Sequence, residues 1–309
     1  MADAVIRIEG LWKTFARRRQ RVIALRDVHL AVQRGSVVAF VGPNGAGKTT
    51  TIYAMLGLLA PTRGSITIFG EPAGSVAARR QLGFLSEIFY TYPFHTARSA
   101  LRFYGRLAGL TESTLAERIP QKLARLGLAD AIDRRLGTFS KGMIQRLGLA
   151  QALVHEPELL ILDEPTTGLD PEGRRLVAEL ILAEKARGAT VFLSSHILSD
   201  VERTCDHVVM IRRGEIVVSE PIARFGRGAD EWEIEVAGWH PGLAATLAEA
   251  GAAPAAEHDG VAWLRVATPH KQALLRRLVD LGAEVGTVRR SMQSLEDLYM
   301  QHVGGTSSG

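Results

Sequence analysis

A glycine-rich loop directly follows a short apolar run near the start of the chain. Residues 42–49 read Gly-Pro-Asn-Gly-Ala-Gly-Lys-Thr, and residues 37–41 before them are all apolar. This order predicts a buried strand, a tight turn and a helix start, in which successive backbone N–H groups point into one concavity that binds oxyanions. The helix beginning at Lys48 adds its positive end. The loop therefore predicts a nucleoside triphosphate site.

The residues of this loop have different expected contributions. Lys48 is expected to reach the β and γ phosphates, and the Thr49 hydroxyl is expected to ligate Mg²⁺. A tight turn that binds nothing is the alternative, and the Lys-Thr pair argues against it. The other predicted nucleotide-binding residues of this segment are Gly42, Pro43, Asn44, Gly45, Ala46, Gly47 and Thr50.

The composition is that of an ordinary globular protein with room for more than one domain. The 309 residues are 46% apolar and 23% charged, and a net charge of +4 without a basic tail does not argue for nucleic acid as a partner.

The single cysteine, Cys205, excludes an internal disulfide and suits a reducing cytoplasm. No stretch approaches the roughly 18 uncharged apolar residues that a membrane span needs. The first residues read as a strand rather than as a signal peptide.

The pattern of apolar residues divides the chain near residues 222–230. Before that boundary, short β-type runs alternate with helical patterns, and the continuously apolar runs 37–41, 159–162 and 190–193 are typical of central strands covered on both faces. The other expected strands of this part are 6–8, 28–32, 65–69, 208–211 and 216–218. We therefore expect an α/β domain over residues 4–222.

A smaller α+β domain is expected over residues 230–309. A strand with alternating apolar residues begins this region, and helical and strand patterns then take turns. The expected elements are a strand at 232–236, a helix at 241–251, a strand at 261–266, a helix at 269–282, a strand at 284–289 and a final helix from Ser294.

Two carboxylates follow the apolar run 159–162. In Asp163-Glu164-Pro165 the acids stand at the end of a strand, and the carboxyl ends of parallel strands are where α/β folds bind ligands. Since successive strand residues face opposite sides, the two acids should have different roles. We expect Asp163 to hold Mg²⁺, directly or through water, and Glu164 to polarise the attacking water. A solvated acid pair is the alternative, which the phosphate loop upstream disfavours.

The motifs of the chain, taken in order, resemble those of the ATP-binding cassette (ABC) ATPases. The segments that carry the resemblance are 42–49, 139–143 (Phe-Ser-Lys-Gly-Met), 159–164, 168–170 (Gly-Leu-Asp) and 194–196 (Ser-Ser-His). The resemblance covers about residues 4–220. It implies a P-loop NTPase whose ABC nucleotide-binding domain has a mainly parallel sheet, an antiparallel β portion and a helical subdomain at about 90–155.

The resemblance also implies two copies stacked head to tail, with MgATP between the phosphate loop of one copy and the signature of the other. Ser140 and Gly142 match the signature that binds the γ-phosphate held by a partner subunit, and Asp170 matches the loop that links the two sites. His196 matches the switch histidine at the γ-phosphate, and Phe15 matches the aromatic residue that stacks on adenine. Plain structural explanations exist as well: Ser140 and Asp170 are good helix caps, Phe15 could be a core aromatic, and a lone histidine is usually structural.

The sequence departs from the commonest family pattern at the signature and at one acidic residue. Lys141 and Met143 replace the usual glycine and glutamine of the signature, and Glu87 stands where the family has a glutamine. The Glu87 carboxylate can still ligate Mg²⁺, although it adds negative charge to an anionic site. The resulting Ser-Lys-Gly-Met signature resembles the branch found in exporters of drugs, polysaccharides and lipids.

Two surface segments allow more than one interpretation. Residues 88–98 gather aromatic side chains around Pro93, which either pack against the helix 99–108 or, as we favour, form a groove for a helix of a membrane partner. The arginine-rich residues 17–21 are expected to form a solvated hairpin tip, and contact with phosphates or lipid headgroups is the less favoured interpretation.

The sequence thus predicts the ATP-hydrolysing, energy-coupling subunit of an ABC export transporter. It would use ATP and Mg²⁺ and pair with a second ATPase subunit as a homodimer. It would dock peripherally on a separately encoded transmembrane permease at the cytoplasmic face of the membrane, with no nucleic acid as a partner. The alternative is a soluble ABC ATPase acting on ribosomes or nucleic acid, but such proteins typically carry two cassettes or long coiled-coil insertions, and this chain has neither. A kinase-like P-loop enzyme would leave residues 139–143 unexplained.

Overall fold

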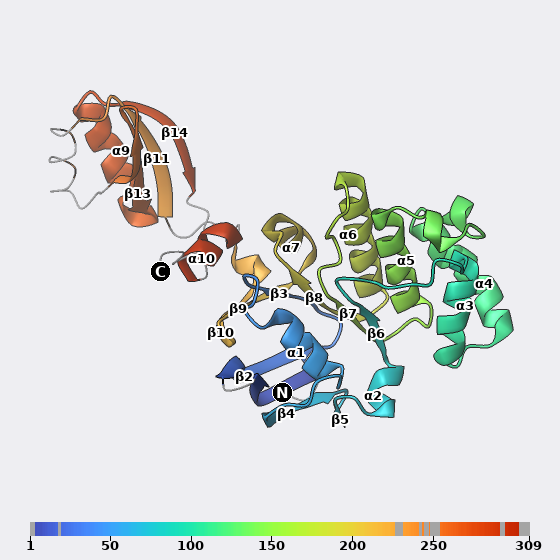
Figure 1. Cartoon of the computed structure of the whole chain (residues 1–309). Coiled ribbons are helices and arrows are strands. Elements are labelled where there is room, and N and C mark those ends of the chain that lie inside the picture. The colour runs from blue at the N-terminus through green and yellow to red at the C-terminus, as the bar shows by residue number, and fades with distance from the viewer. Residues whose placement is uncertain are drawn as a thin grey trace. The chain divides into compact units, whose positions relative to one another are not determined.

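The chain folds into two compact units. The computed structural model describes residues 4–17, 20–225, 231–240, 243, 247, 254–290 and 294–302. The first unit comprises Met1–Ile222 together with Tyr299–Gly309, and the second comprises Ala223–Leu298 (Figure 1). Among the helices of the described residues, none is long and apolar enough to cross a membrane.

The first unit is built on a six-stranded sheet with the strand order β10-β9-β3-β8-β7-β6. Neighbouring strands pair in parallel except β10, which pairs antiparallel to β9. The strands are β3 (Val37–Val41), β6 (Leu82–Leu85), β7 (Leu159–Leu162), β8 (Thr190–Ser195), β9 (His207–Arg212) and β10 (Glu215–Pro221). β3, β7 and β8 are buried along their whole length, so the continuously apolar runs are central strands, as predicted.

Helices cover this sheet on one face, and a helix with a second sheet covers the other (Figure 1). The helices are α1 (Lys48–Met55) on the side of the second sheet, and α5 (Lys141–Leu153), α6 (Pro171–Ala186) and α7 (Leu198–Thr204) on the opposite side. In the core, Phe40 and Phe192 are fully buried and their ring centroids lie 5.4 Å apart. Ile52 of α1 belongs to the same core cluster, which joins the helix to the sheet.

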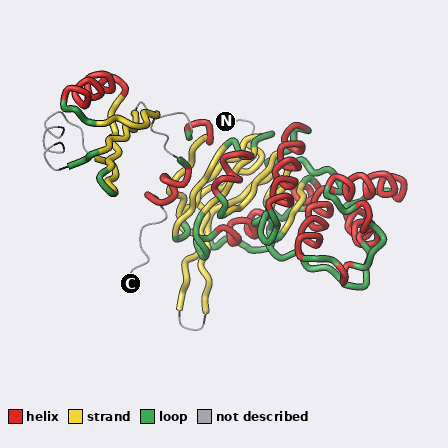
Figure 2. The backbone as a smooth tube through the Cα atoms, turned by 90° about the horizontal axis from the view of Figure 1, so that it is seen from above, coloured by secondary structure: helices red, strands yellow, loops and turns green. Residues whose placement is uncertain are grey.

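The second sheet is the antiparallel portion of this unit, with the order β2-β1-β4-β5. Its strands are β1 (Ala4–Arg17), β2 (Gln20–Gln33), β4 (Arg63–Ile68) and β5 (Glu71–Pro72). β1 and β2 are longer than the predicted strands 6–8 and 28–32, and their outer parts form a hairpin that extends away from both sheets (Figure 2). Arg17 pairs with Gln20 near its end, so the arginine-rich segment belongs to the hairpin end; Arg18 and Arg19 lie outside the described residues.

A helical subdomain inserts between β6 and β7. It consists of α3 (Ala97–Leu107), α4 (Glu112–Arg125) and α5, and the remaining short elements of the first part of the chain are α2 (Val76–Arg80), η1 (Ala129–Ala131), η2 (Leu136–Thr138) and η3 (Ile222–Arg224). Thr96 begins α3 in a capping box with Ser99, and Thr111 caps α4. Such caps stabilise a helix start by about 1 kcal/mol each. Leu101 and Leu115 are buried between the helices.

The second unit is a four-stranded antiparallel sheet with the order β12-β13-β11-β14. Its described elements are β11 (Glu231–Ala237), β12 (Pro254–His258), β13 (Val261–Ala267), η4 (Thr268–His270), α9 (Lys271–Asp280) and β14 (Glu284–Arg290). The strands predicted at 232–236, 261–266 and 284–289 and the helix predicted at 269–282 are present. Of the predicted helix 241–251, only Leu243 and Leu247 are described; both are helical and buried, and the rest lies outside the described residues.

The last helix, α10 (Leu295–His302), differs from the sequence-based expectation. The sequence pattern places it wholly in the C-terminal domain of residues 230–309, whereas the residues from Tyr299 onward group with the first unit. A physical reason is the hydrogen bond that Arg212, at the end of β9, donates to the carbonyl oxygen of His302 at 2.9 Å. A contact between residues so distant in the chain leaves no trace in local periodicity.

Cys205 lies buried at the end of α7. Burial raises the pKa of its thiol to about 12. The thiol therefore keeps its proton at physiological pH and is a weak nucleophile.

Replacing Phe192 by Ala is expected to lower the free energy of unfolding by about 3–5 kcal/mol, because it opens a cavity in a close-packed core. Chemical denaturation followed by circular dichroism measures the change. Leu107→Ala, at a position that is 71% exposed, is the control and should change the stability by less than about 0.5 kcal/mol. Equal effects of the two substitutions would contradict the core assignment.

Candidate active site

The phosphate loop lies between the carboxyl end of β3 and the start of α1. Gly47, immediately before α1, has a φ of 115°, in the left-handed region that glycine tolerates. Gly42 passes so close to β9 that a β-carbon added to it would lie 2.3 Å from the carbonyl oxygen of Ile211. Glycine is therefore required at both positions, at one by conformation and at the other by space.

Lys48 begins α1 and is buried within the loop. Its Nζ atom donates a hydrogen bond to the Gly42 carbonyl oxygen at 2.7 Å and lies 3.7 Å from Oε1 of Glu164. The ammonium thus connects the phosphate loop with the acid that follows β7. A triphosphate entering the loop can replace these partners with oxyanions that carry more charge.

Glu164 is buried and held in a strained backbone conformation. Its φ of 51° is left-handed, which costs a non-glycine residue about 1–3 kcal/mol. Its backbone N–H donates to Ser194 Oγ at 2.8 Å, and His196 Nδ1 lies 2.7 Å from its Oε2. Because a carboxylate only accepts hydrogen bonds, the imidazole donates here. The carboxylate is therefore fixed between Lys48 and His196.

Asp163 faces different surroundings, as the alternation along a strand predicts. It is 1% exposed, and Ser194 Oγ donates to its Oδ1 at 2.6 Å. Its Oδ2 is buried and has no hydrogen-bond partner among the described residues. Burial raises the pKa of the Asp163 carboxyl, and the Ser194 and Thr49 hydroxyls act in the opposite direction. A buried carboxylate oxygen without a partner, beside a hydroxyl, suits a hard cation.

Lys48, Glu164 and His196 line one hollow of about 610 Å³, a volume that suits a small-molecule ligand, whereas Asp163 and Ala46 do not reach its wall. The hollow is lined by Ala24, Gly42, Pro43, Asn44, Gly45, Gly47, Lys48, Thr49, Thr50, Glu87, Glu164, Thr167, His196 and Tyr299. The structure thus brings Glu87, Glu164 and His196 together with the phosphate loop. Sequence reasoning missed Thr167 and Tyr299. Thr167 follows the acid motif closely in the sequence, and that closeness was a signal that could have identified it. No sequence signal indicated that Tyr299 lies at this hollow.

The other predicted site residues lie outside this hollow. Ser140 is exposed and caps α5, accepting a backbone N–H bond at 3.3 Å, and Asp170 caps α6 in the same way at 2.8 Å. Phe15 lies on β1 and is 39% exposed. None of Ser140, Gly142, Asp170 and Phe15 lines the hollow of the described chain. One chain therefore assembles only part of the predicted site.

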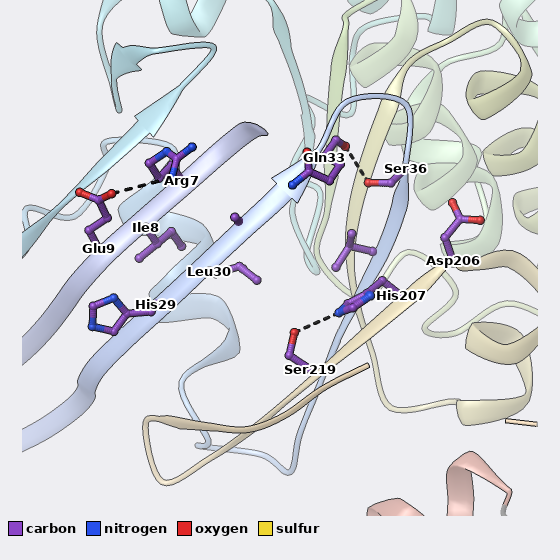
Figure 3. Close-up of a pocket in the computed structure, with 12 residues that line it drawn as sticks. Arg7, Ile8, Glu9, His29, Leu30, Gln33, Ser36, Asp206, His207 and Ser219 are labelled. Carbon is purple, nitrogen blue, oxygen red and sulfur yellow. Dashed lines mark hydrogen bonds and ion pairs between the residues drawn. The ribbon is translucent and has the colours of Figure 1, made fainter. Parts of the chain in front are cut away.

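A second hollow, of about 630 Å³, lies between the β1–β2 strands and the β9–β10 strands (Figure 3). Four of its polar side chains pair with one another: His207 Nε2 lies 3.0 Å from Ser219 Oγ, and Arg7 lies 4.0 Å from Glu9. It has no glycine loop or helix start of the kind that binds phosphate. The chemistry is therefore assigned to the first hollow.

Comparisons with known proteins agree with the fold and the site. Residues 25–167 match the family described as ABC transporter. An uncharacterized ABC transporter ATP-binding protein of Synechocystis sp. is 36% identical over 96% of this chain and 83% of its own length. The bacitracin transport ATP-binding protein BcrA of Bacillus licheniformis is 33% identical over 99% of this chain and 100% of its own length.

A solved structure has the same fold. It is a dimeric ATP-binding cassette bound to ADP and Pi, 21% identical, with a TM-score of 0.65 over 70% of this chain and 98% of that chain. The fold and the site define an ATPase of the cassette type. The chain belongs to the family of ABC transporter ATP-binding proteins.

Asp163→Asn is expected to stabilise the nucleotide-free protein at neutral pH. Burial raises the pKa of Asp163 above the ordinary value of 3.8, so the stability that the protonated form provides below 3.8 is lost as the pH rises through the raised pKa. The neutral amide avoids this loss. Thermal unfolding of both proteins should therefore show a gain that is fully present above the raised pKa and shrinks as the pH falls through it toward 3.8.

A gain from Asp163→Asn that does not vary with pH, or a loss at about pH 8, would contradict the assigned burial penalty.

Proposed function

We propose that this chain is the ATP-hydrolysing subunit of an ABC exporter, in which it drives a separately encoded membrane-spanning permease. The observation that carries the proposal is the junction of the phosphate loop with Lys48, Glu164 and His196 around one hollow. These groups can bind a triphosphate and activate a water beside it. The full-length similarity to a bacitracin transport ATP-binding protein supports coupling to transport, and the Ser-Lys-Gly-Met signature at residues 140–143 supports export.

Hydrolysis can be derived from the contacts of Glu164. Lys48 exchanges the Gly42 carbonyl and Glu164 for the β and γ phosphates of ATP. Glu164 then accepts a proton from the attacking water, whose oxygen bonds to the γ-phosphorus as the bond to the β–γ bridging oxygen breaks. His196, 2.7 Å from the carboxylate, holds it in place for that proton. The residues supply position and charge, with no covalent intermediate.

Mg²⁺ is the proposed metal, held by Asp163 and Thr49. The buried Asp163 Oδ2 without a partner and the nearby Thr49 hydroxyl provide hard oxygen ligands. The described residues contain no cluster of three or more His, Cys, Asp and Glu side chains that could hold a metal. Phosphate and water oxygens would complete the ligand set, with Glu87 available from the wall of the hollow. The ion would neutralise charge on the phosphates.

A second copy of the chain is proposed to complete the site. Ser140 and Gly142, at the start of α5, do not line their own hollow, and Ser140 is exposed. A helix start offers backbone N–H groups and positive charge to a phosphate. We infer a head-to-tail homodimer in which the start of α5 from one copy closes the hollow of the other. Asp170 would link the two sites, and Phe15 would stack on adenine.

An exposed apolar patch is the proposed docking surface for the permease. This docking patch lies on residues 88–94 and on α3, and its members, all more than half exposed, are Ile88, Tyr90, Tyr92, Phe94, Phe103 and Leu107. Exposed apolar side chains gathered on neighbouring segments mark interaction sites. Glu87, directly before the patch, lines the nucleotide hollow, so nucleotide and permease would act on one short segment. Docking there would place the chain at the cytoplasmic face of the membrane.

Glu164→Gln tests the mechanism. The amide keeps the size of the side chain but cannot accept the proton of water, so ATP turnover should fall by about 10²–10⁴-fold while ATP binding persists. Phosphate release and equilibrium titration with MgATP measure the two quantities. Glu172→Gln, at an exposed position in the first turn of α6, is the matched control and should hydrolyse ATP at the wild-type rate. Wild-type turnover by Glu164→Gln would remove this carboxylate from the mechanism.

Combined Tyr90→Ala and Phe94→Ala substitutions test the docking patch. The isolated double variant should hydrolyse ATP normally, because neither residue lines the hollow. Co-purification in detergent with the multi-span membrane protein that accompanies the wild-type chain should fall by about tenfold or more. Leu182→Ala, at an exposed position on α6, is the control. Unchanged co-purification would disprove the docking role of the patch. Stable binding of the wild type to ribosomes or DNA without a membrane protein would favour the alternative of a soluble ABC ATPase.

A further inference from the structure

The terminal helix α10 brings an aromatic side chain to the nucleotide hollow. Tyr299 lines this hollow together with the phosphate-loop residues Gly45 and Lys48. The residues from Tyr299 onward belong to the same compact unit as the phosphate loop. The hollow is therefore lined by residues from near the beginning of the chain and from near its end.

The end of α10 is fastened to the strand that supports the phosphate loop. Arg212, the last residue of β9, donates a hydrogen bond to the His302 carbonyl oxygen at 2.9 Å. In the turn that follows β9, the backbone N–H of Gly214 donates to the carbonyl oxygen of Ala46 in the loop at 2.8 Å. The helix end and the phosphate loop are thus both hydrogen-bonded at the end of β9.

The Tyr299 side chain can interact with a nucleotide in two ways. Met300, its neighbour, is 59% exposed, whereas Tyr299 is partly buried on the side of the hollow. Burial raises the pKa of the Tyr299 phenol, so the hydroxyl keeps its proton at neutral pH and can donate a hydrogen bond. The ring adds a rigid apolar surface.

We propose that Tyr299 contacts the bound nucleotide and thereby makes the C-terminal helix part of the ATP site. The inference rests on the proposed nucleotide-binding function of the hollow. A hydrogen bond from the phenol to a nucleotide oxygen is strengthened when that oxygen is charged. By linkage, a nucleotide that touches Tyr299 also stabilises residues 299–302 in their place beside the hollow.

Equilibrium titration of the full chain with MgADP tests the contact, because ADP is not turned over. Tyr299→Ala should weaken MgADP binding by about tenfold. Tyr299→Phe retains the ring, should fold as the wild type does, and should bind with an affinity between those of the wild type and Tyr299→Ala. Met300→Ala alters the exposed neighbour on the same helix turn and should bind MgADP as tightly as the wild type does.

Hydrogen exchange provides a second readout at the helix itself. Saturating MgADP should slow amide exchange in residues 299–302 of the wild type by several-fold. If the wild type fails to bind MgADP, the proposed function of the hollow fails. If the wild type binds but Tyr299→Ala binds equally well, only the Tyr299 contact is overturned. Tighter binding by Tyr299→Ala would overturn it too, because the side chain would then obstruct the hollow.

Discussion

The nucleotide site depends on a close approach between the phosphate loop and β9. A β-carbon at Gly42 would lie 2.3 Å from the Ile211 carbonyl oxygen, and the N–H of Gly214 reaches the Ala46 carbonyl at 2.8 Å. These contacts fix the loop against the sheet, and with it the point at which α1 begins. Lys48 therefore stands at a fixed distance from the ends of β7 and β8. The acids and the histidine of the site are placed by the same sheet.

The buried Glu164 carboxylate has a buried lysine on one side and an exposed histidine on the other. Lys48 and His196 lie on either side of the Glu164 carboxylate, whereas Asp163 depends mainly on the hydroxyl of Ser194. Removing one member of a buried ion pair leaves an uncompensated charge and costs about 3–5 kcal/mol. An apolar core in the same place would stabilise the fold at least as well as this charged cluster, and the left-handed backbone of Glu164 adds a further cost. The arrangement of the cluster is consistent with the proposed hydrolysis and is not required by the packing of the core.

Sequence patterns predicted the elements whose surroundings are uniform along their length. β3 and β7 are apolar because both faces are covered, and the phosphate loop is a contiguous motif. The outer parts of β1 and β2 form a ribbon beyond the sheets and so do not show the alternation of apolar and polar residues that a half-buried strand has. β12 does not show it either, because it carries no β-branched or aromatic residue. The motif resemblance identified Ser140 and Asp170 as candidate site residues. It did not predict which groups their side chains contact. Ser194, which orients both acids, and Tyr299 act through contacts distant in sequence, which local patterns do not encode.

The state of Cys205 has a practical consequence for spectroscopy. The chain has no other cysteine, and the buried thiol, with its pKa of about 12, is a poor target for maleimides and similar reagents. A cysteine introduced at an exposed position, for example by Leu58→Cys, would therefore take up a fluorophore or spin label selectively. Distances between two labels placed in this way can thus be followed in solution without first deleting the native thiol.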